Sequence, residues 1–154
     1  MSKRLSIMQH FASLKPLLDF SAAMHHCGLD RPLVELVLLR ASLINCCAYC
    51  IDMHTKDARA AGETEQRLYM VAGWREASIY SERECAALAW AEAVTRLGDN
   101  GVPQDVYDRA RGSFSEEELL NLTLMVGLIN TWNRVNVAFQ TPGGNYQPTA
   151  RQAA

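Results

Sequence analysis

Residues 35–54 read ELVLLRASLINCCAYCIDMH, a stretch that combines two carboxylates, three thiols and an imidazole with helix-forming residues. At 100° per residue, Cys47, Cys50 and His54 fall within about 60° of one another on a helix. Asn45 is the expected N-cap of this helix, which places Cys47 in the first turn, where free N–H groups and the helix dipole stabilise a thiolate. The stretch therefore predicts a helix with two thiols and a histidine on one face.

A single carboxylate interrupts the apolar run that precedes the thiols. Glu35 lies within Leu33–Leu39, where a large share of the side chains must be buried. A buried carboxylate is costly unless it is paired or protonated, and a group in such a place can exchange protons near neutral pH. The alternative is a side chain that reaches solvent or pairs with Arg40. The sequence alone favours neither.

The composition is that of a folded protein without a dominant charge. The chain has 154 residues, 49% of them hydrophobic and 21% charged, with a net charge of −2. We expect one domain over residues 1–154, with its core at about 15–140, and no binding of nucleic acid or a membrane surface. The longest aliphatic run, Leu36–Leu39, is far shorter than the roughly 20 residues that span a bilayer. No signal-peptide core follows Met1, so a cytoplasmic protein is expected.

The predicted fold is all-α, with about six to seven helices in a single domain. Ser81 with Glu84, and Ser115 with Glu118, have the spacing of capping boxes, and Pro16 suits the first turn of a helix. Apolar residues recur at three- and four-residue steps in the last helix. We expect helices over residues 15–27, 31–45, 46–61, 64–72, 82–98, 103–111 and 115–139.

Two segments are apolar on all sides rather than along one stripe. These are Leu33–Leu39 and Leu119–Ile129. In a chain of this size the excess favours burial against another subunit, so we expect association. The alternative is a central helix enclosed by its own domain.

The five cysteines point to redox or metal chemistry rather than to a disulfide scaffold. An odd number cannot all pair within one chain, and a chain of this length can build a core without disulfides. Cys47 and Cys50 can form a redox pair with His54 as a base, because only a thiolate is nucleophilic. The same three side chains could supply three of the four ligands of zinc. The sequence has no second CxxC or HxxxH, and the remote candidates for further ligands are His25, His26 and Cys27.

The order Glu35, eleven residues, Cys47-x-x-Cys50, three residues, His54 resembles the signature of the alkylhydroperoxidase D-like branch of the carboxymuconolactone decarboxylase family. The surrounding segments 39–42, 48–58, 74–76, 87–93 and 130–134 are also similar to single-domain members, so that the resemblance covers roughly residues 15–140. Decarboxylase members of the wider family lack the CxxC, which disfavours lactone decarboxylation for this chain.

The resemblance implies an all-helical, cofactor-free peroxidase that assembles into homo-trimers or homo-hexamers. In that scheme His54 and Glu35 deprotonate Cys50, which attacks a hydroperoxide. Cys47 then captures the sulfenic acid and closes the disulfide. A dithiol reductant, a protein or a lipoyl group, would attack Cys47 as the more exposed sulfur.

Two positions depart from the family pattern. Tyr49 stands where the best-known peroxidases of the family carry a histidine, and it is expected either to donate a hydrogen bond or simply to pack. Cys46 stands where relatives commonly have glycine, and it is either inert or forms an alternative disulfide. A non-catalytic redox sensor with the same disulfide and a structural zinc site remain the alternative functions.

Overall fold

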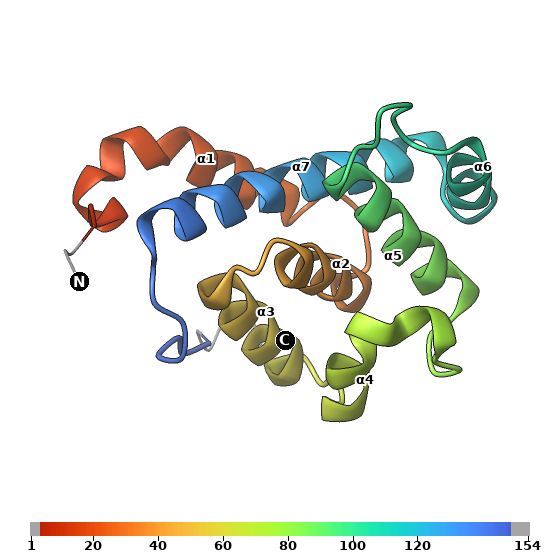
Figure 1. The fold of residues 1–154 in the computed structure, drawn as a ribbon, viewed down its shortest axis with the longest axis horizontal. Helices are drawn as coiled ribbons and strands as arrows, with labels where there is room; N and C mark the ends of the chain where they lie inside the picture. Colours follow the sequence, from red (N-terminus) through yellow and green to blue (C-terminus); the bar gives the residue numbers. More distant parts are fainter. Residues whose placement is uncertain (1–3, 149–154) are drawn as a thin grey trace.

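All the regular elements between residues 4 and 148 are helices, as predicted. The computed structural model describes residues 4–148, and Figure 1 shows the arrangement of seven α-helices and two 3₁₀ helices within them. In chain order they are η1 (Ile7–His10), α1 (Phe11–Met24), α2 (Arg31–Ile44), α3 (Ala48–Ala60), α4 (Glu65–Met70), η2 (Val71–Glu76), α5 (Glu82–Thr95), α6 (Gln104–Ser113) and α7 (Glu116–Phe139).

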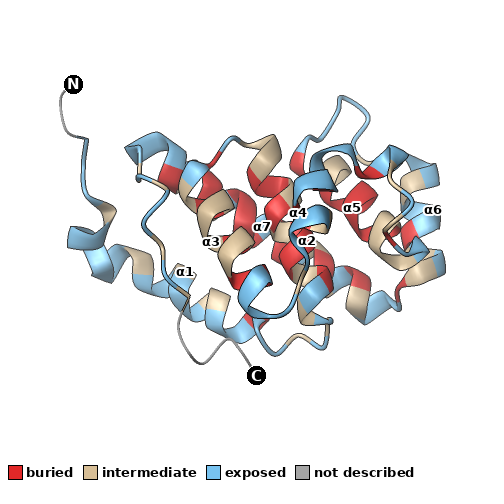
Figure 2. Cartoon of the chain, turned by 90° about the horizontal axis from the view of Figure 1, so that it is seen from below, coloured by how far each residue is buried: buried red, intermediate tan, exposed pale blue. Residues whose placement is uncertain are grey.

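Helix α2 lies at the centre of the molecule and packs against α3, α5 and α7 (Figure 1). Its side chains Leu36, Val37, Leu39 and Ala41 are almost completely buried. The apolar run in this helix is therefore explained by enclosure within the chain's own fold. Figure 2 shows the buried positions gathered in the packed helices, whereas α1 extends along one side with much of its surface exposed.

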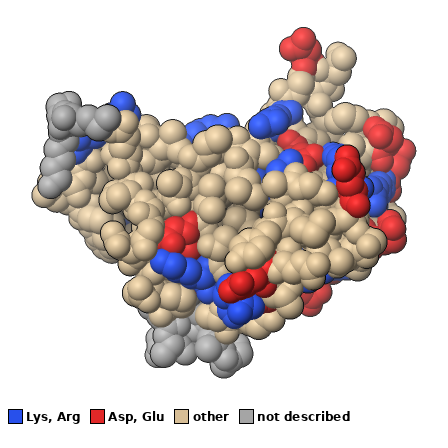
Figure 3. Space-filling view, turned by 60° about the horizontal axis from the view of Figure 1, so that its bottom comes forward, with Lys and Arg blue, Asp and Glu red and all other residues tan. Residues whose placement is uncertain are grey.

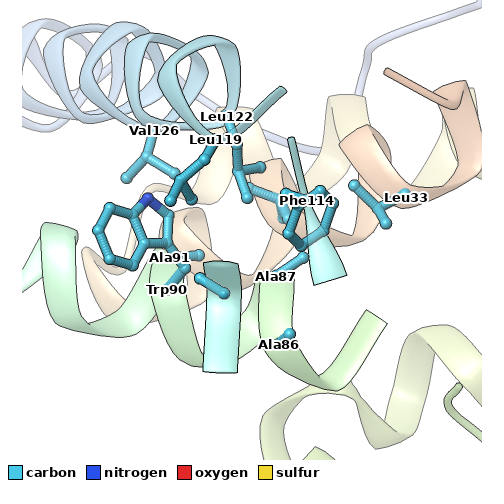
Figure 4. Close-up of a cluster of buried hydrophobic side chains, with 11 residues drawn as sticks. Leu33, Ala86, Ala87, Trp90, Ala91, Phe114, Leu119, Leu122 and Val126 are labelled. Carbon is cyan, nitrogen blue, oxygen red and sulfur yellow. The ribbon is translucent and has the colours of Figure 1, made fainter. Parts of the chain in front are cut away.

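The largest cluster of buried side chains joins α2, α5, α6 and α7. Figure 4 shows Trp90 of α5 beside Leu119, Leu122 and Val126 of α7, with Phe114 close by. Burial of each large apolar side chain contributes about 1.5–3 kcal/mol to folding. Because this cluster lies on the side of α2 away from α3, it anchors the central helix without occupying the site.

Most of the predicted helix ends are confirmed. Both capping boxes are present, with Ser81 and Glu84 starting α5 and Ser115 and Glu118 starting α7. The prediction for Pro16 is wrong, because α1 begins four residues earlier than expected, at position 11 instead of 15. Pro16 therefore lies inside the helix. Pro16 has no N–H to donate to the carbonyl group four residues earlier in the helix. That carbonyl lies in an exposed turn, where water can donate to it instead.

The short turn between α2 and α3 differs from the prediction. Asn45 does not start α3 but ends α2, and Cys47 is itself the N-cap of α3. Cys46 lies between them with a φ of 53°, in the left-handed region, and the Cys47 N–H donates to the Ser42 carbonyl at 3.0 Å. The left-handed residue reverses the chain within three positions, which explains why glycine would suit position 46 better than cysteine.

The described surface carries no dominant charge. On the face that Figure 3 shows, acidic and basic side chains lie next to one another in the lower part and at the right-hand side, and the broad area between them is largely uncharged. Among residues 4–148, no helix combines the length and the apolar character needed to cross a membrane.

We predict that Cys46→Gly is more stable than Cys46→Ala by about 1 kcal/mol, because only glycine adopts a positive φ without steric cost. Both substitutions remove the thiol, so that their difference isolates the backbone. Urea unfolding of the two oxidised variants measures it. Equal free energies of unfolding would show that the turn is not strained at this position.

Candidate active site

The two motif cysteines form a disulfide at the start of α3. Cys47 and Cys50 have Cα atoms 5.3 Å apart, and the Cys47 sulfur also accepts the Cys50 backbone N–H at 3.3 Å. Both residues are buried, with 0% and 1% of their surface exposed. The expectation that Cys47 is the more exposed sulfur is therefore wrong for the oxidised chain, because the turn folds this residue inward against α2.

A buried contact between an imidazole and a carboxylate lies one helical turn beyond the disulfide. The Nδ1 atom of His54 lies 3.0 Å from Oε2 of Glu35, and both residues are only 6% exposed. The Nε of Arg31 lies 4.0 Å from the other carboxylate oxygen. Arg40, the alternative partner considered for Glu35, instead binds Glu92. The carboxylate in the apolar run is thus held by the histidine of the motif.

The proximity of these side chains follows from the helical hairpin. A connection of only three residues makes α2 and α3 antiparallel neighbours, so a side chain near the start of α2 lies opposite one in the middle of α3. Glu35 and His54 occupy those two places. The Nε2 atom of His54 is buried and has no hydrogen-bond partner among the described residues.

Three buried asparagines on α7 contact α2, α3 and the turn between them. Asn133 donates to the Ser42 hydroxyl at 3.1 Å, and Asn45 donates to both Asn130 and Asn133 at 2.8 and 2.9 Å. The third, Asn136, has its Nδ2 atom 3.6 Å from the Cys50 sulfur. Asn136 was not among the site residues expected from the sequence. The three-residue spacing of these asparagines in an apolar helix is the signal that could have found it.

A second buried carboxylate lies farther along α3. Asp57 is 4% exposed, and the Tyr146 hydroxyl lies 2.9 and 3.1 Å from its two oxygens. Burial raises the pKa of Asp57 above its ordinary value, the hydrogen bond from Tyr146 only partly opposes this, and the charge of Glu35 adds to the rise. The site therefore contains two buried carboxylates, Glu35 and Asp57.

A cavity of about 700 Å³ gives access to this group of side chains. Glu35, His54 and Asp57 line one part of it, and mostly apolar side chains of α1, α2 and α7 line the rest. The remote zinc candidates also line it, namely His25, His26 and Cys27. Even so, no three His, Cys, Asp or Glu side chains between residues 4 and 148 are grouped so that they could hold a metal ion. The zinc interpretation thus gains no support from the arrangement.

The segment 141–148, which we call the C-terminal strap, lies against the first turns of α3 (Figure 1). The Asp52 carboxylate accepts the N–H groups of Gly144 and Tyr146 at 2.7 and 3.1 Å, and Lys56 donates to the Tyr146 carbonyl at 2.8 Å. A Cβ at Gly143 would lie 2.6 Å from the Ala48 carbonyl oxygen. The strap therefore closes over the start of α3 in a way that only glycine permits at position 143.

The two positions that depart from the family pattern lie at the edge of the site. Tyr49 packs its ring edge-on against Tyr146, with the ring centroids 6.4 Å apart. Cys46 is exposed and is a free thiol. Tyr49 thus belongs to the surface on which the strap packs. Cys46 is exposed to solvent next to the buried disulfide.

Fold and site together define an all-helical protein with a Cys-x-x-Cys disulfide at a helix start and a buried glutamate–histidine pair beside it. The family model of the carboxymuconolactone decarboxylase family matches residues 13–93, and the chain belongs to this family, in its alkylhydroperoxidase D-like branch.

Similar proteins cover almost the whole chain. The protein YdfG of Bacillus subtilis, itself uncharacterized, is 40% identical over 139 residues, which are 90% of this chain and 95% of YdfG. A protein of unknown function from Agrobacterium tumefaciens, named as a candidate antioxidant defence protein AhpD, is 36% identical with a TM-score of 0.90, covering 94% of this chain and 100% of its own. A peroxidase-related protein from Ralstonia eutropha JMP134 shares the fold alone, at 19% identity and a TM-score of 0.76 over 87% of this chain and 72% of its own.

We predict that Gly143→Ala displaces the strap, because the added Cβ would collide with the Ala48 carbonyl. Reduction of the Cys47–Cys50 disulfide by dithiothreitol should then accelerate roughly three- to tenfold. The exposed neighbour Asn145, changed to alanine, serves as the control and should react at the wild-type rate. Equal rates for wild type and Gly143→Ala would mean that the strap does not limit access to the disulfide.

We predict that Asp57→Asn changes how stability depends on pH. A carboxyl group with a raised pKa in the folded state stabilises at low pH, and this contribution is lost as the pH rises from its ordinary value of 3.8 through the folded value. The free energy of unfolding of the asparagine variant should lack this decline. The difference in free energy of unfolding between the variant and wild type should therefore shift in favour of the variant as the pH rises through that range. Urea unfolding at a series of pH values measures it, and parallel curves would contradict a raised pKa.

Proposed function

We propose that the protein is a thiol-dependent peroxidase that reduces hydroperoxides with the Cys47–Cys50 couple. The observation that carries this proposal is the buried Glu35–His54 contact one turn beyond Cys50, whose sulfur is able to form a disulfide with Cys47. A general base and a pair of thiols are the groups that such a reaction requires.

The first half of the cycle oxidises Cys50. His54 takes the proton of the Cys50 thiol, and the thiolate attacks the terminal oxygen of the hydroperoxide. A sulfur–oxygen bond forms while the oxygen–oxygen bond breaks, and its electron pair leaves with the alkoxide. The alkoxide takes the proton from His54 and departs as an alcohol, so that Cys50 is left as a sulfenic acid.

The second half of the cycle closes and reopens the disulfide. The Cys47 thiol attacks the Cys50 sulfur, the sulfur–oxygen bond breaks, and hydroxide leaves as water with the proton of Cys47. A dithiol reductant then exchanges with the disulfide and is itself oxidised, which restores both thiols. The balance is one hydroperoxide and one dithiol consumed for one alcohol, one water and one disulfide formed.

Glu35 has a positioning role in this scheme. Its contact with Nδ1 of His54 places the proton of the neutral ring on that nitrogen and leaves Nε2 as the atom that exchanges protons. The buried and unpartnered state of Nε2 among the described residues supports this assignment. The cavity beside Glu35 and His54 supports entry of the hydroperoxide from that side.

The similarity to the Agrobacterium protein supports an antioxidant role, and the family resemblance supports a dithiol reductant and assembly into a homo-trimer or homo-hexamer. Helix α7 retains exposed apolar side chains at Leu120, Leu124 and Val137, which such an assembly could cover.

A redox sensor is the second candidate function. It is favoured by the strap, because this segment lies directly on the helix start that carries the disulfide. In a sensor, oxidation would alter the strap without repeated turnover. Stoichiometric consumption of peroxide, with no further consumption on addition of a dithiol, would support this alternative over the peroxidase.

We predict that peroxide consumption driven by dihydrolipoamide is lost in Cys50→Ser, whereas Cys47→Ser forms a sulfenic acid once but does not turn over. Glu35→Gln should retain both thiols but slow the reaction by about tenfold or more, because the base loses its orientation. Cys85→Ser, which changes a half-buried thiol outside the site, serves as the control. Wild-type turnover in Cys50→Ser would refute the peroxidase proposal.

A further inference from the structure

The side chain of Asn136 on α7 contacts the sulfur that the proposed cycle oxidises. Its Nδ2 atom lies 3.6 Å from the Cys50 sulfur and 3.0 Å from the Trp132 carbonyl, so that each amide hydrogen has an acceptor. The Trp132 carbonyl can only accept, which settles which end of the amide is the nitrogen. Asn136 is 4% exposed, so this donor is shielded from water.

The acceptor end of the same amide is unused. The Oδ1 atom of Asn136 is buried without a hydrogen-bond partner among the described residues, and so is Nε2 of His54. Buried polar atoms without partners are rare because each loses its hydration without compensation. Here one belongs to a side chain in contact with Cys50, and the other to a side chain one turn beyond it. Each of these two atoms can therefore accept a hydrogen bond from a polar group that enters the site.

The other two asparagines of α7 show what a purely structural role looks like. Asn130 donates to Thr95 and accepts from Asn45, and Asn133 donates to Ser42 and accepts from Asn45. Both amide ends are therefore satisfied by other parts of the fold. Asn136 differs from these two asparagines, because its Nδ2 contacts the Cys50 sulfur and its Oδ1 has no hydrogen-bond partner among the described residues.

We propose that Asn136 is a catalytic residue, whose Nδ2–H stabilises the Cys50 thiolate and whose Oδ1 accepts the O–H of the bound hydroperoxide. The proposal rests on the peroxidase function. In the first half of the cycle the amide holds the attacking sulfur and the oxygen that it attacks side by side. When the oxygen–oxygen bond has broken, the same acceptor binds the O–H of the Cys50 sulfenic acid until Cys47 displaces hydroxide.

This role also separates the two sulfurs chemically. Cys47 receives a backbone N–H at the start of α3, which favours its thiolate, whereas Cys50 receives the side-chain amide. A donor to each sulfur removes the advantage that the helix start would otherwise give to Cys47. The His54 base one turn away then selects Cys50 as the attacking sulfur.

The test measures the reactivity of Cys50 with and without peroxide. In a Cys47→Ser background, alkylation of Cys50 by iodoacetamide is followed by mass spectrometry across pH. Replacing Asn136 by leucine, which has a similar volume and no amide, should shift the midpoint upward and slow alkylation at pH 7 roughly tenfold. Formation of the Cys50 sulfenic acid with cumene hydroperoxide should slow by more than alkylation, because the acceptor for the peroxide is also lost.

Matched variants separate this role from folding. Asn121→Leu removes an amide from the same helix, about four turns before Asn136, where it donates to the Cys27 carbonyl, and should leave the alkylation profile of Cys50 unchanged. Asn136→Asp keeps the size of the side chain but places a carboxylate beside the sulfur, so it should shift the midpoint upward even if the leucine variant does not fold. An unchanged profile in a folded Asn136 variant would overturn the proposal.

The two proposals fail in different ways. If wild type consumes no peroxide while the Asn136 variants shift the alkylation profile, the peroxidase function is refuted and only the contact with the thiolate stands. If wild type turns over and folded Asn136 variants match it in both alkylation and sulfenic acid formation, the role of Asn136 is refuted and the peroxidase function stands.

Discussion

The contact between Glu35 and His54 is the interaction on which the arrangement of the site depends. A carboxylate in the central helix of an all-helical fold loses its hydration, and the imidazole 3.0 Å away replaces part of it. For that imidazole to reach Glu35, α3 must fold back on α2 after a very short connection. The tight reversal in turn places Cys46 in a left-handed conformation and buries Cys47 at the start of the next helix.

Both sulfurs are buried, and the cavity and the C-terminal strap border the site on different sides and adjoin at Tyr146. The cavity reaches the side of Glu35 and His54, whereas the C-terminal strap covers the start of α3 near Cys47. In the proposed peroxidase cycle, a small oxidant and a bulkier dithiol could approach from these two sides. The packing of the strap against Tyr49 and Asp52 would then set the access of the reductant, and the cavity would set the access of the peroxide.

The sequence predicted well what local patterns determine. All seven helices and both capping boxes follow from local patterns, and the contact between Glu35 and His54 agrees with what the family resemblance implied. The spacing of the asparagines on α7 could have singled out Asn136, but its contact with Cys50 and the contact of Tyr146 with Asp57 join residues 86 and 89 positions apart, and no local pattern indicates which partner they contact. The N-cap assignment of Asn45 failed because its side chain binds α7 instead of the backbone of α3, a choice that only the tertiary structure makes.

The row of asparagines on α7 has a consequence for the rotational setting of that helix. Apolar side chains of similar size can exchange places when a helix turns about its axis, so apolar packing alone selects an angle only weakly. Amides at Asn130, Asn133 and Asn136 find their partners at one angle only. If α7 rotated about its axis by the angle of one residue, all three amides would lie in apolar surroundings. The hydrogen bonds of these asparagines thus fix the rotation of α7 about its axis, and this rotation places the Asn136 amide next to Cys50.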